Sequence, residues 1–344
     1  MPRITNSMLV SNYMTNMQRN LGNMSTLQNQ LSSGKNIQRA SENPYLAVRS
    51  MQLNTEITAN KQYNTNITDT SNWLDTTDTA LGQANNIMKR IKELMIKAGN
   101  GAYGEDEVGA IKDEIVEKTK ELGQVINTSF DGNFIFGGTK STSKPVNVDA
   151  DGNIYYVDKD GNKLDTTTDP TGAIKNQLNS SLKTEISDGV VVDYNKTAVD
   201  ILEFKDKNGN NINVMDQLSD LIKCLNVASG EDTTGTTALS DGTVIPNSKD
   251  ALDKINGDLL TNIDSISQNI LKLRSNVGAM QNRMESAKSN NEDQSYNMTS
   301  ILSQTEDIDF TEKTMEYSVM QTVYMATLQT SSKVLTNTLL DYIN

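Results

Sequence analysis

The hydrophobic positions at both ends of the chain recur at alternating spacings of four and three residues. This rhythm places apolar side chains in a narrow stripe along one side of a helix, and another helix must cover that stripe. Because the striped segments are far apart in the sequence, we predict that they pack against each other or against neighbouring copies. The stripe near the start is Val10, Met14, Met17, Leu21, Met24, Gln28 and Leu31, and those near the end are Leu259, Ile263, Ile266, Ile270, Leu273, Val277, Met280, Met284 and Ala287, then Leu328, Ser332, Leu335, Leu339 and Tyr342.

The ends of the first predicted helices carry local signals. The first helix is predicted to end at Ser32-Ser33-Gly34, because glycine can adopt the left-handed conformation that closes a helix. Asn43-Pro44 combines a good N-cap with a proline suited to the first turn. A long helix is therefore predicted from there to Ala98, and a third helix is predicted to end near Phe130.

Polar residues interrupt the stripe of the long helix, among them Asn60 and Asp78. Such residues weaken a helical seam but fix its register. A further long helix is predicted over about 248–289. Asp309 with Glu312 resembles a capping box that opens the last helix.

The middle of the chain, about 134–211, alternates short β-prone runs with turn clusters, which predicts a small β insertion between helical halves. Residues 229–248 are rich in Gly, Thr, Ser and Asp and are interpreted as a flexible surface loop. The predicted strands are Ile154–Val157, Val190–Val192 and Leu202–Phe204, and the predicted turns are Asp151-Gly152-Asn153, Asp160-Gly161-Asn162 and Asn208-Gly209-Asn210.

These patterns predict a mainly α, elongated fold with a small β insertion, in which long antiparallel helices pair the N- and C-terminal segments as a coiled coil or helical bundle. The expected assembly interface lies on the terminal helices, at Met14, Met17, Leu21, Met24, Leu328, Leu335 and Leu339. The expected domains are a terminal helical pair of 1–35 with 312–344, a helical bundle of 36–133 with 212–311, and a β-rich inserted domain at 134–211.

Composition agrees with thin helical layers. Only 35% of the residues are apolar and 5% aromatic, which is little material for a thick core. A net charge of −13 argues against binding nucleic acid, which requires clustered lysine and arginine. No apolar run reaches the roughly 18 residues of a membrane span, and the first residues lack the apolar core of a cleaved secretory signal.

The residues needed for catalysis are scarce. The chain has no histidine, the commonest general base, and its one cysteine, Cys224, is interpreted as a small buried hydrophobe. Gly137-Gly138 lacks the spacing of a phosphate-binding loop and is interpreted as a bend that leaves a strand. We therefore predict no enzyme, no cofactor and no metal site, and attribute Trp73 and the methionines to packing.

The Asp-rich turns are the main competing signal. Three segments share the pattern Asp-x-Asp/Asn-Gly-Asn, and calcium favours several oxygen ligands on a tight loop. They lack the glutamate that closes a twelve-residue calcium loop, and hairpin turns use the same residues for backbone reasons. A calcium-responsive binding protein stays open as an alternative; it requires a calcium-dependent melting temperature that is lost when Asp151 and Asp160 become Asn.

Several motifs, taken together and in order, resemble the flagellin superfamily, and in particular its hook–filament junction branch. The resemblance covers both helical ends and fades in the β insertion. Ser41-Glu42-Asn43-Pro44 departs mildly from the more usual Ser-Asp-Asp-Pro of the junction branch. The matching segments are Leu31–Lys35, Ser41–Pro44, Ala98–Gly101, Phe134–Gly138, Leu273–Arg283, Ser300–Asp309 and Leu339–Ile343.

The resemblance implies a bacterial structural protein of the extracellular flagellum, exported unfolded through the flagellar type III pathway without signal cleavage. It further implies a ring of copies that adapts the hook to the filament. The implied partners are other copies, a second hook-associated protein, flagellin and an export chaperone, with no nucleic acid and no membrane. A minor filament flagellin is the closest alternative, and an enzyme in the β insertion has no supporting motif.

Overall fold

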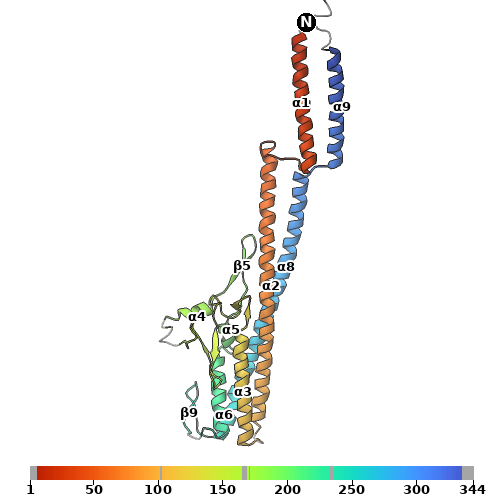
Figure 1. Cartoon of the computed structure of the whole chain (residues 1–344). Coiled ribbons are helices and arrows are strands. Elements are labelled where there is room, and N and C mark those ends of the chain that lie inside the picture. The colour runs from red at the N-terminus through yellow and green to blue at the C-terminus, as the bar shows by residue number, and fades with distance from the viewer. Residues whose placement is uncertain (1–5, 101–102, 165–168, 170, 233–234, 335–344) are drawn as a thin grey trace, which may run out of the picture. The chain divides into compact units, whose positions relative to one another are not determined.

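The computed structural model describes residues 6–100, 103–164, 169, 171–232 and 235–334 (Figure 1). They divide into two compact units, here called the terminal unit, Met1–Gln62 with Glu292–Asn344, and the central unit, Tyr63–Asn291. Two long helices contribute residues to both. The helices are α1 (Asn6–Ser33), α2 (Pro44–Ala98), α3 (Glu105–Ile126), α4 (Ala173–Leu178), α5 (Ala198–Leu202), α6 (Val214–Ala228), α7 (Ser248–Lys254), the π-helix η1 (Ile255–Leu259), α8 (Leu260–Glu306) and α9 (Phe310–Val334).

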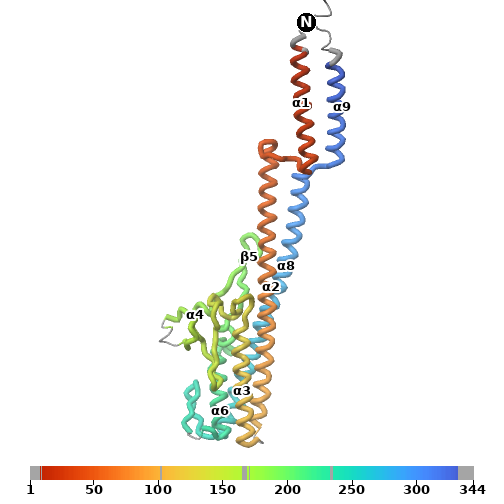
Figure 2. Tube along the Cα trace, in the orientation of Figure 1, coloured from red at the N-terminus to blue at the C-terminus, as the bar shows by residue number. Residues whose placement is uncertain are grey.

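In the terminal unit, α1 and α9 lie side by side and antiparallel (Figure 2). The Tyr13 hydroxyl near the start of α1 donates a 2.7 Å hydrogen bond to the carbonyl of Thr327 near the end of α9. In the same unit, α2 and α8 are joined where the buried Asn60 amide donates to the Ser295 hydroxyl at 3.0 Å. Polar pairs of this kind fix the register of neighbouring helices.

The helix ends follow the predicted signals. Gly34 adopts a left-handed φ of 72° directly after α1, and Asn43 accepts a hydrogen bond from the backbone N–H of Leu46 at the start of α2. The predicted bounds of α2 are confirmed at both ends. Asp309 caps α9 by accepting from the backbone N–H groups of Thr311 and Glu312.

The central unit holds the hydrophobic core, which α2, α3, α6, α7 and α8 share with segments of the β insertion. Antiparallel α2 and α8 are joined by Arg274, whose guanidinium donates to both carboxylate oxygens of Asp78 at 2.9 and 2.8 Å. Asp78 was one of the polar positions predicted to fix the seam, and it does so through a two-point ion pair. Ile135 and Phe136, between the β hairpins, are fully buried in the same core.

The strands form separate two-stranded antiparallel hairpins. The predicted strands at Ile154 and Val190 are confirmed, whereas Leu202 ends α5 and the strand begins one residue later. A capping box between Thr197 and Asp200 begins this short helix. The pairs are β1 (Ser129–Phe130) with β2 (Asn133–Phe134), β3 (Val146–Val148) with β4 (Ile154–Tyr156), β5 (Lys183–Ser187) with β6 (Val190–Asp193), β7 (Glu203–Lys205) with β8 (Asn211–Asn213), and β9 (Thr237–Ala238) with β10 (Val244–Ile245).

Three sequence predictions need correction. The third helix ends at Ile126 rather than near Phe130, because β1 begins at Ser129. The helix predicted over 248–289 continues to Glu306 and passes through η1. The segment 229–248 contains the β9–β10 hairpin and buries Leu239 and Ile245, so its described residues do not form a simple surface loop.

The mainly α fold class, with long helices that pair N- and C-terminal segments and a small β-rich insertion, is confirmed. The three-part domain division predicted from the sequence remains a proposal.

Candidate assembly surface

The terminal unit has almost no core of its own. Among its described residues, only Leu27, Leu53 and Ile57 are buried apolar side chains, whereas the central unit buries several dozen. Helices of this length gain most of their stability from packing an apolar face. The terminal unit is therefore built from helices whose apolar surface is largely uncovered in the single chain.

The exposed apolar side chains gather in this same unit, although the central unit is larger. Contiguous exposed apolar surface beyond a few hundred Å² marks an interaction site in a soluble protein. The exposed large apolar residues of the terminal unit are Met8, Met14, Leu21, Tyr45, Val48, Met51, Tyr296, Ile301, Phe310, Met315, Val319, Val323, Met325 and Leu328.

Helix α9 is apolar around much of its circumference. Tyr317, Met320 and Tyr324 are half-buried in the α1–α9 pair, while Met315 and Val319 are more than half exposed, at 64% and 57%. A helix that is hydrophobic on all sides is normally buried on all sides. Since α1 leaves some apolar side chains of α9 exposed, a further helix or subunit is needed to cover them.

The side of α1 that packs against α9 differs in part from the apolar stripe predicted from the sequence. Tyr13 and Leu27 turn toward α9, whereas Met14, Leu21 and Gln28 are exposed. The remaining members of the predicted stripe lie on the seam, so α1 carries two adjacent stripes that share residues. The stripe with Tyr13 and Leu27 packs against α9, and the stripe with Met14 and Leu21 is exposed to solvent.

The predicted interface residues fall into three groups. Met14, Leu21 and Leu328 are exposed by 40–46%. Met17 and Met24 are half-buried in the α1–α9 pair. Leu335 and Leu339 lie outside the described residues. The interface itself remains a prediction. Sequence reasoning omitted Met315, Val319 and Met325, whose signal was that apolar residues occur on more than one side of α9.

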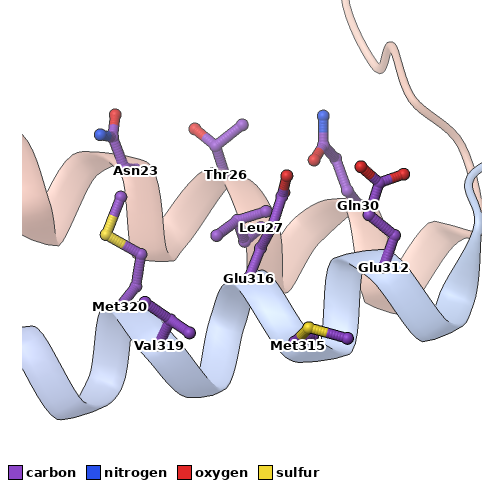
Figure 3. Close-up of a pocket in the computed structure, with 9 residues that line it drawn as sticks. All are labelled: Asn23, Thr26, Leu27, Gln30, Glu312, Met315, Glu316, Val319 and Met320. Atoms are coloured by element: carbon purple, nitrogen blue, oxygen red, sulfur yellow. The ribbon is translucent and has the colours of Figure 1, made fainter.

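A groove of about 660 Å³ runs between α1 and α9 (Figure 3). Leu27 enters it from α1, and Met315, Val319 and Met320 line it from α9. Methionine is flexible and polarizable and fits surfaces of varied shape. Glu312 and Glu316 make part of the rim acidic. Asn23, Thr26 and Gln30 of α1 also line the groove, so it combines an apolar floor with polar edges, which suits the side chains of another helix.

The α1–α2 connection and the α8–α9 connection are hydrogen-bonded to each other. The backbone N–H of Asn36 donates to the Glu306 carbonyl at 2.6 Å, and that of Ile308 donates to the Gly34 carbonyl at 3.1 Å. Lys35 adds an ion pair with Asp307 at 2.8 Å. The hydrogen bond to Asp307 raises the pKa of Lys35. These contacts hold the α1–α2 and α8–α9 connections together.

The Asp-rich segments have the contacts of structural turns. In each, one aspartate accepts the backbone N–H of the asparagine four residues later at 2.8–2.9 Å, and its second oxygen accepts the side-chain amide of that asparagine. These are the side-chain-to-backbone bonds by which Asp and Asn form tight turns. The aspartates are Asp149, Asp158 and Asp206.

Cys224, Trp73 and Gly138, which the sequence analysis weighed as functional residues, are explained by burial and packing. Burial raises the pKa of the Cys224 thiol to about 12, so the nucleophilic thiolate is scarce at neutral pH. Trp73 makes edge-on contacts with Phe130 and Tyr194. A Cβ on Gly138 would lie 2.5 Å from two backbone carbonyl oxygens, which explains the glycine. No described helix is long and apolar enough to cross a membrane.

Comparisons with known proteins find matches at both ends of the chain. The family described as bacterial flagellin N-terminal helical region matches residues 4–141, and the bacterial flagellin C-terminal helical region matches residues 260–343. A flagellin of Clostridium tyrobutyricum is 24% identical, covering 92% of this chain and 94% of its own length. Flagellar hook-associated protein 3 of Escherichia coli is 24% identical, covering 90% of this chain and 88% of its own length.

Among solved structures, one described as a putative flagellar hook-associated protein from Vibrio parahaemolyticus has a TM-score of 0.58 at 19% identity. The likeness covers 77% of this chain and all of the other. At this identity, the likeness is one of fold.

Proposed function

The chain belongs to the bacterial flagellin family, and from that premise we propose that it is the structural adaptor that joins the flagellar hook to the filament. The observation that carries the proposal is the terminal unit, which has almost no core and leaves apolar side chains exposed on α1, α2, α8 and α9. A surface of this kind becomes stable when neighbouring subunits cover it. The similarity of fold to a hook-associated protein supports the junction as its location.

The proposed role is structural rather than enzymatic. The exposed helices supply contact area, and the central unit supplies a rigid, well-packed body. Copies of the chain would form a ring, with a second hook-associated protein on one side and flagellin on the other. An adaptor must contact different proteins on its two sides, and the methionines of α1 and α9 suit this because they repack readily.

The proposed location is the extracellular part of the flagellum, reached through the flagellar type III export pathway without a cleaved signal and with the help of a chaperone. Helices that depend on neighbours for stability unfold more readily than a packed core. This property favours passage through a narrow channel followed by folding on assembly.

A minor filament flagellin is the second candidate. The observation that favours it is the identity to the Clostridium tyrobutyricum flagellin, which equals that to hook-associated protein 3 over a similar span. The two functions differ in where the chain lies: an adaptor occupies one short band beside the hook, whereas a minor flagellin is distributed along the filament.

Immunogold labelling of intact flagella tests the proposal. An epitope inserted between Asp160 and Gly161 enters an exposed turn where Gly161 has open space around it. We expect one short band of gold at the hook end of each filament. Gold along the filament would instead establish the minor-flagellin function. Swimming of the tagged strain is the control for assembly.

A further inference from the structure

The single tryptophan of the chain, Trp73, lines a pocket within the central unit. The pocket has a volume of about 350 Å³, which lies at the small end of the range for small-molecule sites. It is enclosed by α2, by the β1–β2 hairpin, and by β5 with the residue that follows β6. Its lining combines aromatic and charged side chains, among them Trp73, Phe130, Tyr194, Asp69, Asp131 and Lys183.

Aromatic rings form the apolar part of this pocket. Phe130 and Tyr194 each meet Trp73 edge-on, with ring centroids 6.2 and 5.8 Å from that of Trp73. Both rings are half-buried, whereas Trp73 is only 8% exposed and its Nε1 has no hydrogen-bond partner. Buried polar atoms normally have such a partner. An unpartnered N–H donor on a residue that lines a pocket therefore points to an acceptor atom supplied by a ligand.

The polar lining offers groups that the chain itself leaves free. Among the described residues, the carboxylates of Asp69 and Asp131 and the hydroxyl of Tyr194 have no hydrogen-bond or ion-pair partner. Lys183, by contrast, lies 3.9 Å from the carboxylate of Asp193. Ionised carboxylates only accept hydrogen bonds, whereas an indole N–H only donates them. A ligand that satisfies both kinds of group must carry donors as well as acceptors.

The walls of the pocket are fixed by the chain. Asp131 and Gly132 form the two-residue turn between β1 and β2, with left-handed φ values of 50° and 76° that suit a tight hairpin. The Asn66 amide donates to the Glu185 carbonyl at 3.0 Å and so fastens β5 to α2. Walls that are ordered before a ligand arrives lower the entropy cost of binding it.

We propose that this pocket binds a neutral sugar. The C–H groups on one face of a sugar ring pack against aromatic side chains, while its hydroxyls donate to carboxylates and accept from N–H and O–H groups. The two free carboxylates repel an anionic ligand. A simple cation would leave the Trp73 N–H without an acceptor. The assembly surface of the terminal unit takes no part in this site, so the proposal goes beyond the proposed function and does not depend on it.

Tryptophan fluorescence of the full chain tests the proposal, because its single tryptophan reports on this pocket alone. The probes are glucose, galactose, mannose and N-acetylglucosamine, with glucuronate as an anionic sugar and choline as an organic cation. We expect a saturable change with at least one neutral sugar, at a Kd on the order of 1 mM, and at least about tenfold weaker binding of glucuronate. No saturation with any neutral sugar, equal binding of glucuronate, or tighter binding of choline would each overturn the proposal.

Substitution of the free carboxylates identifies the site. Asp69→Ala and Asp131→Asn should each weaken sugar binding at least about tenfold, the loss expected for one hydrogen bond to a charged group. Asparagine at 131 keeps the turn, because it tolerates the left-handed backbone. The matched control is Asp253→Ala, which removes an exposed carboxylate of α7 outside the pocket and should bind like the unchanged chain. Equal loss in the control, or full binding by both pocket variants, would contradict the proposal. Circular dichroism melting confirms that each variant is folded.

Discussion

The variant Ile270→Asp is expected to unfold the central unit. Ile270 is 1% exposed and lies on the inner face of α8. The change removes a buried aliphatic side chain and places a carboxylate among apolar neighbours, a combined loss of about 4 kcal/mol or more. This is a large share of the total stability of a typical domain, about 5–15 kcal/mol. We expect the melting temperature to fall by about 8–16 °C, or the cooperative transition to disappear.

The adjacent residue provides the matched control. Leu271 belongs to the same helix and is 47% exposed, so Leu271→Asp should change stability by no more than about 0.5 kcal/mol. Thermal melting followed by circular dichroism measures both variants. Equal destabilisation by the two changes would show that α8 does not bury the face assigned to the core.

The variant Leu328→Asp is expected to leave the single chain folded and to prevent assembly. Leu328 is 43% exposed on α9, so the carboxylate is hydrated in the free chain and the melting curve should stay the same. In an assembly that covers α9, the same carboxylate loses its water, at a cost of several kcal/mol in every subunit. We expect the number of filaments per cell to fall by at least about tenfold, since about 1.4 kcal/mol already changes an equilibrium tenfold.

Electron microscopy counts the filaments, and immunoblots of the culture medium show whether the variant is still exported. Leu328→Met is the control, because it keeps an apolar side chain at the same position. Normal filament numbers in the Leu328→Asp strain would show that Leu328 is not part of the assembly surface.

The helix boundaries were predictable because local chemistry sets them. Asn43-Pro44 and Gly99 bracket α2, and Gly34 ends α1 through its left-handed backbone. Asp78 was expected to fix the register of a helical seam. Its partner Arg274 could not be named, because a pairing so distant in the sequence depends on how the two helices are aligned.

The rotation of α1 was not fully predictable. Its spacing allows two overlapping stripes, one through Tyr13 and Leu27 and one through Met14 and Leu21, and both satisfy the helical period. The choice between the two stripes depends on α9, because the Thr327 carbonyl of α9 accepts a hydrogen bond from the Tyr13 hydroxyl. The β9–β10 hairpin was missed for a different reason: its polar composition suggested a loop, whereas two side chains, Leu239 and Ile245, reach the core.

Part of the candidate surface could be predicted, and part could not. The sequence pointed to α1 and α9, and exposed Met14, Leu21 and Leu328 fit that expectation. Exposure of Met315 and Val319 could not be inferred, because apolar residues on every side of α9 do not reveal which side a single chain covers.

Electron microscopy of cells that lack this gene, with flagellin assayed in the culture medium, tests the central claim most directly. An adaptor between hook and filament predicts finished hooks without filaments and flagellin shed into the medium. Filaments of normal number and length would contradict the junction function.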